Sequence, residues 1–351
     1  MSQKQITEKS TSCLRWVYPL LLGLIAATLI KTIATHYVTT EWKSLYNWVL
    51  YFCCYFMALH FFTTLEKKSI KHSAARHPSY DWPIPGVQGT LGIGLKTLIF
   101  VLSNLLSLLN PVLLAQRLRL MFGMLRVGLR VKGREDEIRH YKTKAIYHLP
   151  FNEQWLVYHG GDTPQTSHSW HVLNQRYAYD FVKADATYKR HKGSGFQLGD
   201  YQCFCKEVIS ASDGEVITVV NGEKHSPFVG WFFINPFSMQ AAGNHVIIKH
   251  EEGEYGFYAH LINGSVPLSV GDKVKAGQLI GRCGFSGSTT EPHLHFHLQD
   301  SPSFFDSVGL PVSFERVAVA GAECRKARIQ RGSWVENCSG KLKKTRHLNS
   351  D

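Results

Sequence analysis

The sequence predicts a mainly β domain of antiparallel sheets, preceded by an α-helical membrane anchor region. Two long apolar runs lie near the N-terminus of the 351-residue chain. From about Tyr141 onward, short β-rich segments such as QWLVYHG, GEVITVV and HVIIKH alternate with turns that contain Gly or Asn, which is the pattern of an all-β domain. We therefore expect an anchor region at 1–140, a β domain at 141–320 and a basic C-terminal tail at 321–351.

The first apolar run is Trp16–Ile30, which Arg15 precedes and Lys31 follows. It is short for a spanning helix, but residues 32–38 extend it and Lys31 can place its ammonium group at the membrane interface. Because this run offers only poor small-residue cleavage sites, we expect an uncleaved anchor. The second run, Leu45–Leu65, is long enough to span and contains no Asp, Glu, Lys or Arg.

A third apolar run, Thr97–Ala115, is either a third span or a helix that lies in the membrane interface, and Asn104, Asn110 and Pro111 weaken it as a span. The stretch 116–134 follows it, with basic residues spread among apolar ones. This stretch suits either the anionic head groups of a membrane or a solvated helix face that covers the β domain. The sequence does not choose between the two.

The topology that these runs predict is ambiguous. The basic segment 67–76, after the second run, should lie in the cytoplasm, because positively charged loops tend to stay there. Three spans then place the β domain outside the cytoplasmic membrane, whereas two spans leave it inside. The basic stretch 116–134 argues against export by the same rule.

The net charge of +12 and the eight cysteines restrict the class of protein. A basic chain attracts polyanions, but no zinc-finger, RNA-binding aromatic or helix-turn-helix pattern accompanies the charge, so we expect no nucleic-acid partner. The cysteines form no CxxC pair, which argues against a structural zinc site of the ribbon or finger type. Cys324 and Cys338 can pair if the domain faces an oxidising compartment, and stay thiols otherwise.

The residues that carry chemistry cluster in the second half of the chain. EPHLHFHLQD has His293, His295 and His297 at alternate positions, so in a strand these residues share one face. Asp180 lies between aromatic residues in an apolar segment, where an unpaired carboxylate is costly to bury. A metal ion compensates such a carboxylate, and so does pairing with Arg176 or with a backbone amide.

Two further elements accompany this group. His260 ends the apolar segment YGFYAHL. The glycine-rich GFSGSTTEPHLHF allows a turn that brings the histidine strand beside a cleft.

From Ser210 to Leu298 the segments SASDGEVITVV, GNHVIIKH, YGFYAHL and VGDKVKAGQLIGRCGFSGSTTEPHLHFHL follow one another. This stretch resembles the core of the lysostaphin/LytM-type zinc metallopeptidases, a family of peptidoglycan endopeptidases. With the Asp180 region, the resemblance covers about Val157 to Leu310. VGDKVKAGQLIG also resembles a biotinyl- or lipoyl-type hairpin, but no modifiable lysine lies in the expected turn and the histidines would have no role.

The resemblance implies one zinc ion held by two His and one Asp, with a fourth position left open for water. On this chain it assigns Asp180 and His295 as metal ligands, and His260 and His293 as catalytic histidines that do not bind the metal. It implies that one of these two takes the proton of the attacking water or donates to the developing oxyanion.

One position departs from the family pattern. The first ligand His usually stands four residues before the Asp, and here that position is Arg176, which cannot bind zinc. A longer loop lets His171 reach a metal at Asp180, with His168 as the alternative; if neither reaches it, the domain is a zinc-free binding module. For His297, where the family often has Glu, we expect an exposed side chain rather than one that orients a ligand.

These features predict a membrane-anchored zinc metalloendopeptidase that hydrolyses peptide bonds in the cross-links or stem peptides of peptidoglycan. The alternatives are a non-catalytic module that binds cell wall or activates a hydrolase, and a membrane-bound peptidase that acts on a protein. A cell-wall role places the β domain on the periplasmic or exterior side of the cytoplasmic membrane. The expected cofactor is Zn2+, and the expected partners are peptidoglycan peptides and the membrane.

Overall fold

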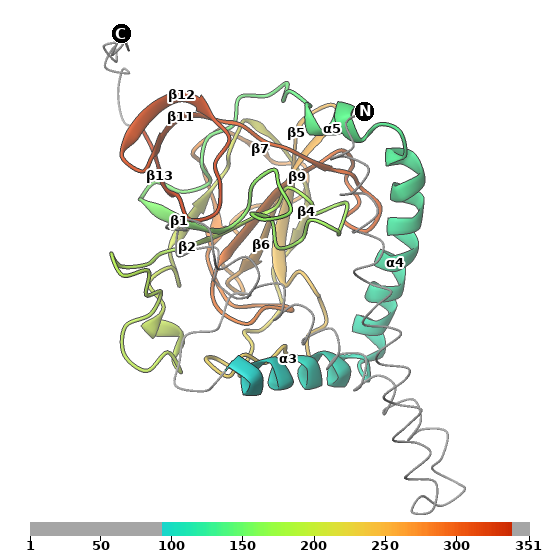
Figure 1. Ribbon diagram of the computed structural model, residues 1–351, viewed down its shortest axis with the longest axis vertical. Helices are drawn as coiled ribbons and strands as arrows, with labels where there is room; N and C mark the ends of the chain where they lie inside the picture. Colours follow the sequence, from blue (N-terminus) through green and yellow to red (C-terminus); the bar gives the residue numbers. More distant parts are fainter. Residues whose placement is uncertain (1–92, 339–351) are drawn as a thin grey trace, which may run out of the picture. The chain divides into compact units, whose positions relative to one another are not determined.

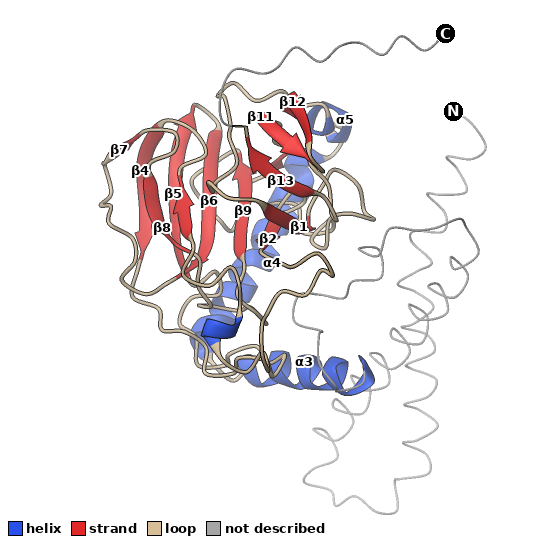
Figure 2. Ribbon diagram, turned by 90° about the vertical axis from the view of Figure 1, so that its left-hand side faces the viewer, coloured by secondary structure: helices blue, strands red, loops and turns tan. Residues whose placement is uncertain are grey.

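A computed structural model of the protein describes residues 93–338 (Figures 1 and 2). The chain divides into two compact units, Met1–Arg76 and His77–Asp351, and all the described residues belong to the second. The two apolar runs predicted to anchor the chain, Trp16–Ile30 and Leu45–Leu65, lie outside the described residues, so their assignment stays a prediction.

The predicted mainly β, antiparallel domain is confirmed. An eleven-stranded sheet has the order β12-β11-β13-β1-β2-β9-β6-β5-β4-β7, with β10 paired to β9, and β3 and β8 form a second, two-stranded sheet. The strand bounds are β1 Trp155–His159, β2 Tyr179–Val182, β3 Glu207–Ile209, β4 Gly214–Val220, β5 Asn244–Glu251, β6 Glu254–Leu261, β7 Lys273–Val274, β8 Leu279–Arg282, β9 Leu294–Gln299, β10 Gly309–Leu310, β11 Phe314–Val319, β12 Ala322–Ala327 and β13 Trp334–Asn337.

The strand β9 runs between β2 and β6 near the middle of the large sheet (Figure 2). All six of its residues are buried, so both faces of the sheet are covered here. Its apolar residues, Leu294, Phe296 and Leu298, lie in the main hydrophobic core. The same core includes Val208 and Ile280 of the small sheet. Because side chains alternate along a strand, His295 and His297 belong to the opposite face. That face carries the chemistry.

The C-terminal strands complete one edge of the large sheet. β13 pairs antiparallel with β1, with Leu156 opposite Trp334, and β11 lies between β13 and β12. Part of the segment predicted as a basic tail therefore contributes two strands to the sheet. Cys324 and Cys338 are free thiols in this structure.

In the part of the chain that the structure describes, three helices precede β1: α3 Ile93–Ser107, α4 Pro111–Val131 and α5 Glu135–Arg139. A single 3-10 turn, Leu198–Asp200, lies between β2 and β3. The apolar run Thr97–Ala115, a candidate third span, is broken between α3 and α4. The Asn110 side chain accepts hydrogen bonds from Val112 N (2.9 Å) and Leu113 N (3.3 Å), and so caps α4.

Within residues 93–338, no single helix is both long and apolar enough to cross a bilayer; α3 and α4 meet these criteria only as a pair, bent by 97°. The domain lies inside the angle between the two helices (Figure 1). α4 packs against the domain through Val127 and Val131, which contact Val308. At Gly123 a Cβ atom would lie only 1.9 Å from the Phe305 carbonyl oxygen, so the close approach requires glycine.

Candidate metal centre and active site

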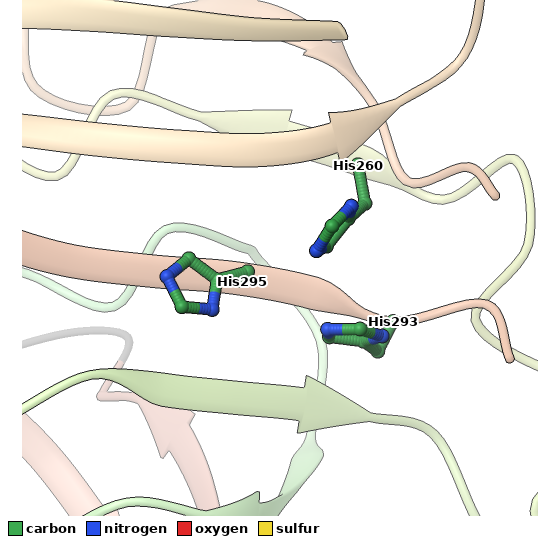
Figure 3. Close-up of side chains that lie close together, drawn as sticks. All are labelled: His260, His293 and His295. Atoms are coloured by element: carbon green, nitrogen blue, oxygen red, sulfur yellow. The ribbon is translucent and has the colours of Figure 1, made fainter. Parts of the chain in front are cut away.

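Three neighbouring strands bring the candidate site together. In the pairing of β2 with β9, Asp180 lies directly opposite His295, and in the pairing of β6 with β9, Ala259 lies opposite the same histidine. His260, the next residue of β6, thereby reaches the cluster. Figure 3 shows His260, His293 and His295 converging from these strands, and their ligand atoms all lie within 4.8 Å of one another.

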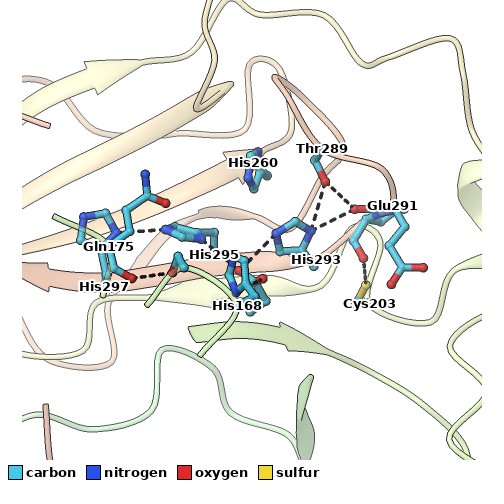
Figure 4. A network of polar contacts seen from close by, with 12 residues as sticks. His168, Gln175, Cys203, His260, Thr289, Glu291, His293, His295 and His297 are labelled. Carbon is cyan, nitrogen blue, oxygen red and sulfur yellow. Dashed lines mark hydrogen bonds and ion pairs between the residues drawn. The ribbon is translucent and has the colours of Figure 1, made fainter. Parts of the chain in front are cut away.

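Asp180 contacts three histidines of the cluster, His168, His293 and His295, which are labelled in Figure 4. Its Oδ1 lies 2.9 Å from His295 Nδ1 and 3.4 Å from His293 Nε2, and its Oδ2 lies 3.3 Å from His168 Nδ1. A tetrahedral zinc ion with bonds of about 2.0–2.1 Å holds its ligand atoms about 3.3–3.4 Å apart. The distances from Asp180 to His168 (3.3 Å) and to His295 (2.9 Å) are close to this spacing, so these three residues are candidate ligands.

The charge of Asp180 is stabilised although the side chain is only 3% exposed. Burial by itself raises the pKa of this carboxyl group, but His168 and His293 hold its pKa well below the ordinary value. A buried carboxylate needs such positive or hydrogen-bonding partners, and a metal ion is the strongest partner of this kind.

The far side of His295 is fixed by a chain of hydrogen bonds along β9. His295 Nε2 lies 3.0 Å from His297 Nδ1, and His297 Nε2 lies 2.9 Å from Gln299 Oε1. Gln299 Nε2 donates to the Ser301 carbonyl at 2.8 Å, which requires Gln299 Oε1 to be an acceptor. His297 must then donate through Nε2 and accept through Nδ1.

This direction of donation decides how His295 faces Asp180. His295 donates through Nε2 to His297, so in a neutral ring Nδ1 carries a lone pair. The lone pair points at a carboxylate oxygen 2.9 Å away, and two acceptors at this distance need a positive charge between them. A metal ion is one such charge, and a proton on Nδ1 is another, so the residues present are compatible with the group that the resemblance implies.

His297 corrects one expectation from the sequence. We expected an exposed side chain, but its exposed fraction is 0%. Burial, together with the neighbouring His295, lowers the pKa of His297 to about 3. The ring is therefore neutral and can act as a fixed hydrogen-bond relay behind the ligand.

The loop before β2 explains how the chain departs from the family spacing. Arg176 Nε donates to the Trp170 carbonyl at 3.0 Å and its guanidinium lies 5.1 Å from the centre of the Trp170 ring. Ser167 Oγ donates to the Arg176 carbonyl at 2.8 Å, which closes the loop. The loop brings His168 Nδ1 to 3.3 Å from Asp180 Oδ2, although His168 and His171 are both exposed residues. The geometry favours His168 over the predicted ligand His171, whose assignment stays a prediction.

The two predicted catalytic histidines have defined orientations. His260 Nδ1 donates to the Ser286 carbonyl at 2.8 Å, and His293 Nδ1 donates to the Glu291 carbonyl at 3.0 Å. Their Nε2 atoms are left for the cluster, and the ring centroids are 4.7 Å apart. The backbone of His260 has φ 62°, in the left-handed region, and the Gly284 amide donates to its carbonyl at 2.9 Å. This conformation is uncommon for a residue with a side chain and is found at functional sites.

The electrostatic surroundings of these two histidines differ. Burial, with the positive potential of His293 and His295, lowers the pKa of His260 well below its ordinary value. Burial also acts to lower the pKa of His293, but Asp180 overcomes it and raises that pKa to about 9. In the described structure, His260 is therefore an acceptor at Nε2 and His293 a donor at Nε2.

Sequence reasoning missed three residues of the site. Gln299 continues the alternate spacing of the histidines on β9, and this spacing was the available signal. His159 is 2% exposed on β1, its ring centroid lies 4.9 Å from that of His168, and it pairs in register with Asp180. Arg190, the third, forms a buried ion pair with Glu291, for which the sequence gives no signal because the partners are a hundred residues apart.

The fold and the cluster define a class: an antiparallel β domain with a buried histidine and aspartate site of the metallopeptidase kind. Residues 189–306 match the model of Peptidase family M23, which confirms the resemblance to lysostaphin/LytM-type peptidases for this part of the chain. The matched segment contains His260, His293 and His295, whereas His168 and Asp180 precede it.

The curated relatives are similar over short stretches. The cell division protein DipM of Caulobacter vibrioides is 30% identical over 99 residues, which are 28% of this chain and 13% of the relative. The glycyl-glycine endopeptidase ALE-1 of Staphylococcus capitis is 33% identical over 91 residues, which are 26% of this chain and 25% of the relative. This chain thus spans a quarter or less of the length of either relative.

Solved structures include a zinc-containing peptidase from Vibrio cholerae. It is 22% identical, with a TM-score of 0.29, over 47% of this chain and 39% of the other.

Proposed function

We propose that the protein is a zinc-dependent metalloendopeptidase that hydrolyses peptide bonds in peptidoglycan, in its cross-links or stem peptides. The observation that carries this proposal is the set of distances from Asp180 to His168 and His295, at the spacing of zinc ligands, with His260 and His293 beside them. The match to Peptidase family M23 supports the reaction class. The endopeptidase relatives ALE-1 and peptidoglycan DD-endopeptidase ShyA of Vibrio cholerae support the substrate class.

The residues have distinct roles in this reaction. His168, Asp180 and His295 would hold the zinc ion, which would supply Lewis acidity to the reaction. His260 has its Nδ1 committed to the Ser286 carbonyl, so its Nε2 accepts a proton from the attacking water. His293 has its Nδ1 committed to the Glu291 carbonyl, so its Nε2 donates to the oxyanion that develops on the substrate.

A second candidate function is a non-catalytic module that binds cell wall or activates another hydrolase. The observation that favours it is Arg176, which occupies the family's first ligand position and holds a loop instead of a metal. The cell division protein DipM among the relatives is compatible with either candidate.

The same experiment separates these candidates. Zinc is measured by elemental analysis on the full chain purified in detergent, beside His168→Ala, His171→Ala and His295→Ala, and each protein is incubated with purified peptidoglycan. We expect near one zinc per chain, lost in His168→Ala and His295→Ala and kept in His171→Ala, together with release of peptide fragments. A folded wild type without zinc would leave the binding module. Zinc kept in His168→Ala and lost in His171→Ala would make His171 the ligand.

The location of the reaction is part of the proposal. Peptidoglycan hydrolysis requires the β domain on the periplasmic or exterior side of the cytoplasmic membrane. Protease is added to intact cells and to cells whose outer membrane alone has been permeabilised. A β domain that stays protected from protease in the permeabilised cells would contradict a periplasmic or exterior location.

A further inference from the structure

The helices α3 and α4 carry apolar side chains on the side that faces away from the domain. On α4, the side that packs on the domain holds Leu113, Val127 and Val131, all buried. A helix on a protein surface normally exposes polar residues opposite such a face. Here the opposite side of α4 exposes large apolar residues: Leu114, Leu118, Met121, Phe122, Leu125 and Leu129.

The corner where α3 meets α4 is the most exposed apolar part. Leu109 is 79% exposed. Asn110 Nδ2 donates to the carbonyls of Pro236 (3.0 Å) and Ser238 (2.8 Å), which ties the loop before β5 to this corner. The residue between those carbonyls, Phe237, is 76% exposed. Two segments far apart in sequence therefore place their most exposed apolar side chains at one corner.

The polar side chains near the corner are satisfied within the protein. Ser103 Oγ donates to the Phe100 carbonyl at 2.8 Å and accepts from Ile234 N at 3.1 Å. Ser107 Oγ donates to the Asn104 carbonyl at 2.6 Å. An apolar solvent tolerates such residues only when their hydrogen bonds are made internally.

The sequence around the corner is uncharged, and the residues that flank it are basic. Residues 97–116 contain no charged side chain, and no Asp or Glu occurs from 93 to 134. Basic residues flank this uncharged run in the sequence: Lys96 precedes it, and Arg117, Arg119, Arg126, Arg130, Lys132 and Arg134 follow from the second turn of α4 onward. Arg126 and Arg130 pair with Asp306 and Asp300 of the domain and still remain 63% and 48% exposed.

We propose that the corner between α3 and α4 enters the surface of an anionic lipid bilayer, with the helices rising from it to the head-group level. At a rise of about 1.5 Å per residue, Arg126 lies roughly 20 Å along α4 from the corner. A tilted helix then brings its basic residues to the phosphates while the corner reaches the acyl chains. A charge-free run that basic residues flank on both sides matches an anionic bilayer, and it disfavours a second copy, whose like charges would repel.

The bend accounts for the absence of a single span in this part of the chain. A 97° break with the domain inside the angle directs both apolar sides outward from one corner. This arrangement suits a wedge in one leaflet. The proposal does not depend on peptidase activity, so the two can fail separately.

The test uses the full chain in vesicles of phosphatidylcholine and phosphatidylglycerol. Photoreactive benzoylphenylalanine replaces Leu109, Leu129 or Val270, the last an apolar control that is 65% exposed on the loop before β7. We expect lipid adducts at Leu109 in several-fold excess over Val270, with Leu129 lower than Leu109. Cross-links from Leu109 to residues 1–92, to a second copy or to nothing would overturn the proposal.

A second measurement tests the anionic preference. The Leu109 photoprobe is repeated in vesicles of phosphatidylcholine alone and in high salt. We expect the lipid adduct to fall several-fold in both, because the attraction of basic residues to anionic head groups is lost or screened. An unchanged yield would reject the anionic lipid as the partner.

Discussion

Arg190 Nε and Glu291 Oε1 form an ion pair at 2.6 Å in which each side chain is only 2% exposed. The guanidinium also lies 4.3 Å from the centre of the Tyr158 ring. Glu291 is linked to the candidate active site as well, because its carbonyl accepts a hydrogen bond from His293. A buried pair of this kind can be neutral relative to apolar side chains of similar volume, but removal of one partner leaves the other charge buried and unpaired.

Replacing one member of this pair should destabilise the protein strongly. For Glu291→Gln we expect a loss of about 3–5 kcal/mol in the free energy of unfolding, because Arg190 keeps its charge without a partner in a buried position. The measurement is chemical unfolding followed by fluorescence. The double variant Arg190→Met, Glu291→Leu is the control, and it should recover much of the loss. A double variant as unstable as the sum of its single changes would argue that the charges do not interact.

The hydrogen-bond chain behind His295 should control zinc affinity. Gln299→Leu removes the oxygen that accepts from His297 Nε2. The tautomer of His297 is then no longer fixed, and neither is the tautomer of His295 that leaves a lone pair on Nδ1 for the metal. We expect zinc affinity to fall about 10–100-fold, measured by competition with a chelating dye. Gln278→Leu, at an exposed glutamine in the turn before β8, should leave affinity unchanged. Equal affinity in both variants would reduce Gln299 to a packing role.

The strand β9 shows how far sequence alone reaches. The alternate spacing of His293, His295 and His297 predicts a shared face, and the structure has it. Sequence could not reveal that Gln299 terminates the chain of hydrogen bonds, because its direction depends on the Ser301 carbonyl in a later turn. The same limit explains the error at His297, whose burial comes from Phe257 and Phe304, with ring centroids 4.8 and 6.3 Å away.

The ligand loop illustrates a different limit. Sequence spacing identified a missing histidine at Arg176 and offered two replacements, and the choice between them depends on loop closure. Hydrogen bonds from Ser167 and Ser169 to carbonyls near Arg176 set that closure. Such side chain to backbone contacts are local, but their combined geometry is not readable from residue types.

The two catalytic histidines should separate metal binding from turnover. His260→Ala removes the Nε2 acceptor without removing a zinc ligand, so we expect zinc content to be kept and kcat on peptidoglycan peptides to fall about 100- to 10,000-fold. His245→Ala, at a buried histidine on β5, controls for loss of a nearby ring. Loss of zinc in His260→Ala would instead make this residue a ligand.

Acid should destabilise the domain partly through His250, which lies away from the metal cluster. Its Nδ1 donates to the Asp213 carbonyl at 2.8 Å, and its Nε2 accepts from Tyr258 Oη at 3.1 Å. Tyr258 Oη already accepts from Ala211 N, so a protonated His250 would direct a second donor at an oxygen that already accepts one hydrogen bond. Burial outweighs the Asp213 carbonyl and the charge of Glu254, and lowers the pKa of His250 to about 4.

The sign of the pH effect follows from this lowered pKa. The unfolded chain takes up a proton on this histidine below about pH 6.5, and the folded chain does not until about pH 4. The stability is therefore present above pH 6.5 and is lost as the pH falls towards 4. Since the ring is only partly buried, we expect about 1–2 kcal/mol from this residue, less than the full shift would give.

The variant His250→Gln isolates this contribution, because glutamine offers a donor and an acceptor but does not titrate. Unfolding midpoints of wild type and variant are compared from about pH 7.5 to about pH 5. We expect the wild type to lose more stability than the variant across this interval, while histidines elsewhere contribute equally to both. Parallel pH profiles for the two proteins would mean that His250 titrates alike in the folded and unfolded chains, and that its contacts to Asp213 and Tyr258 do not exclude the proton.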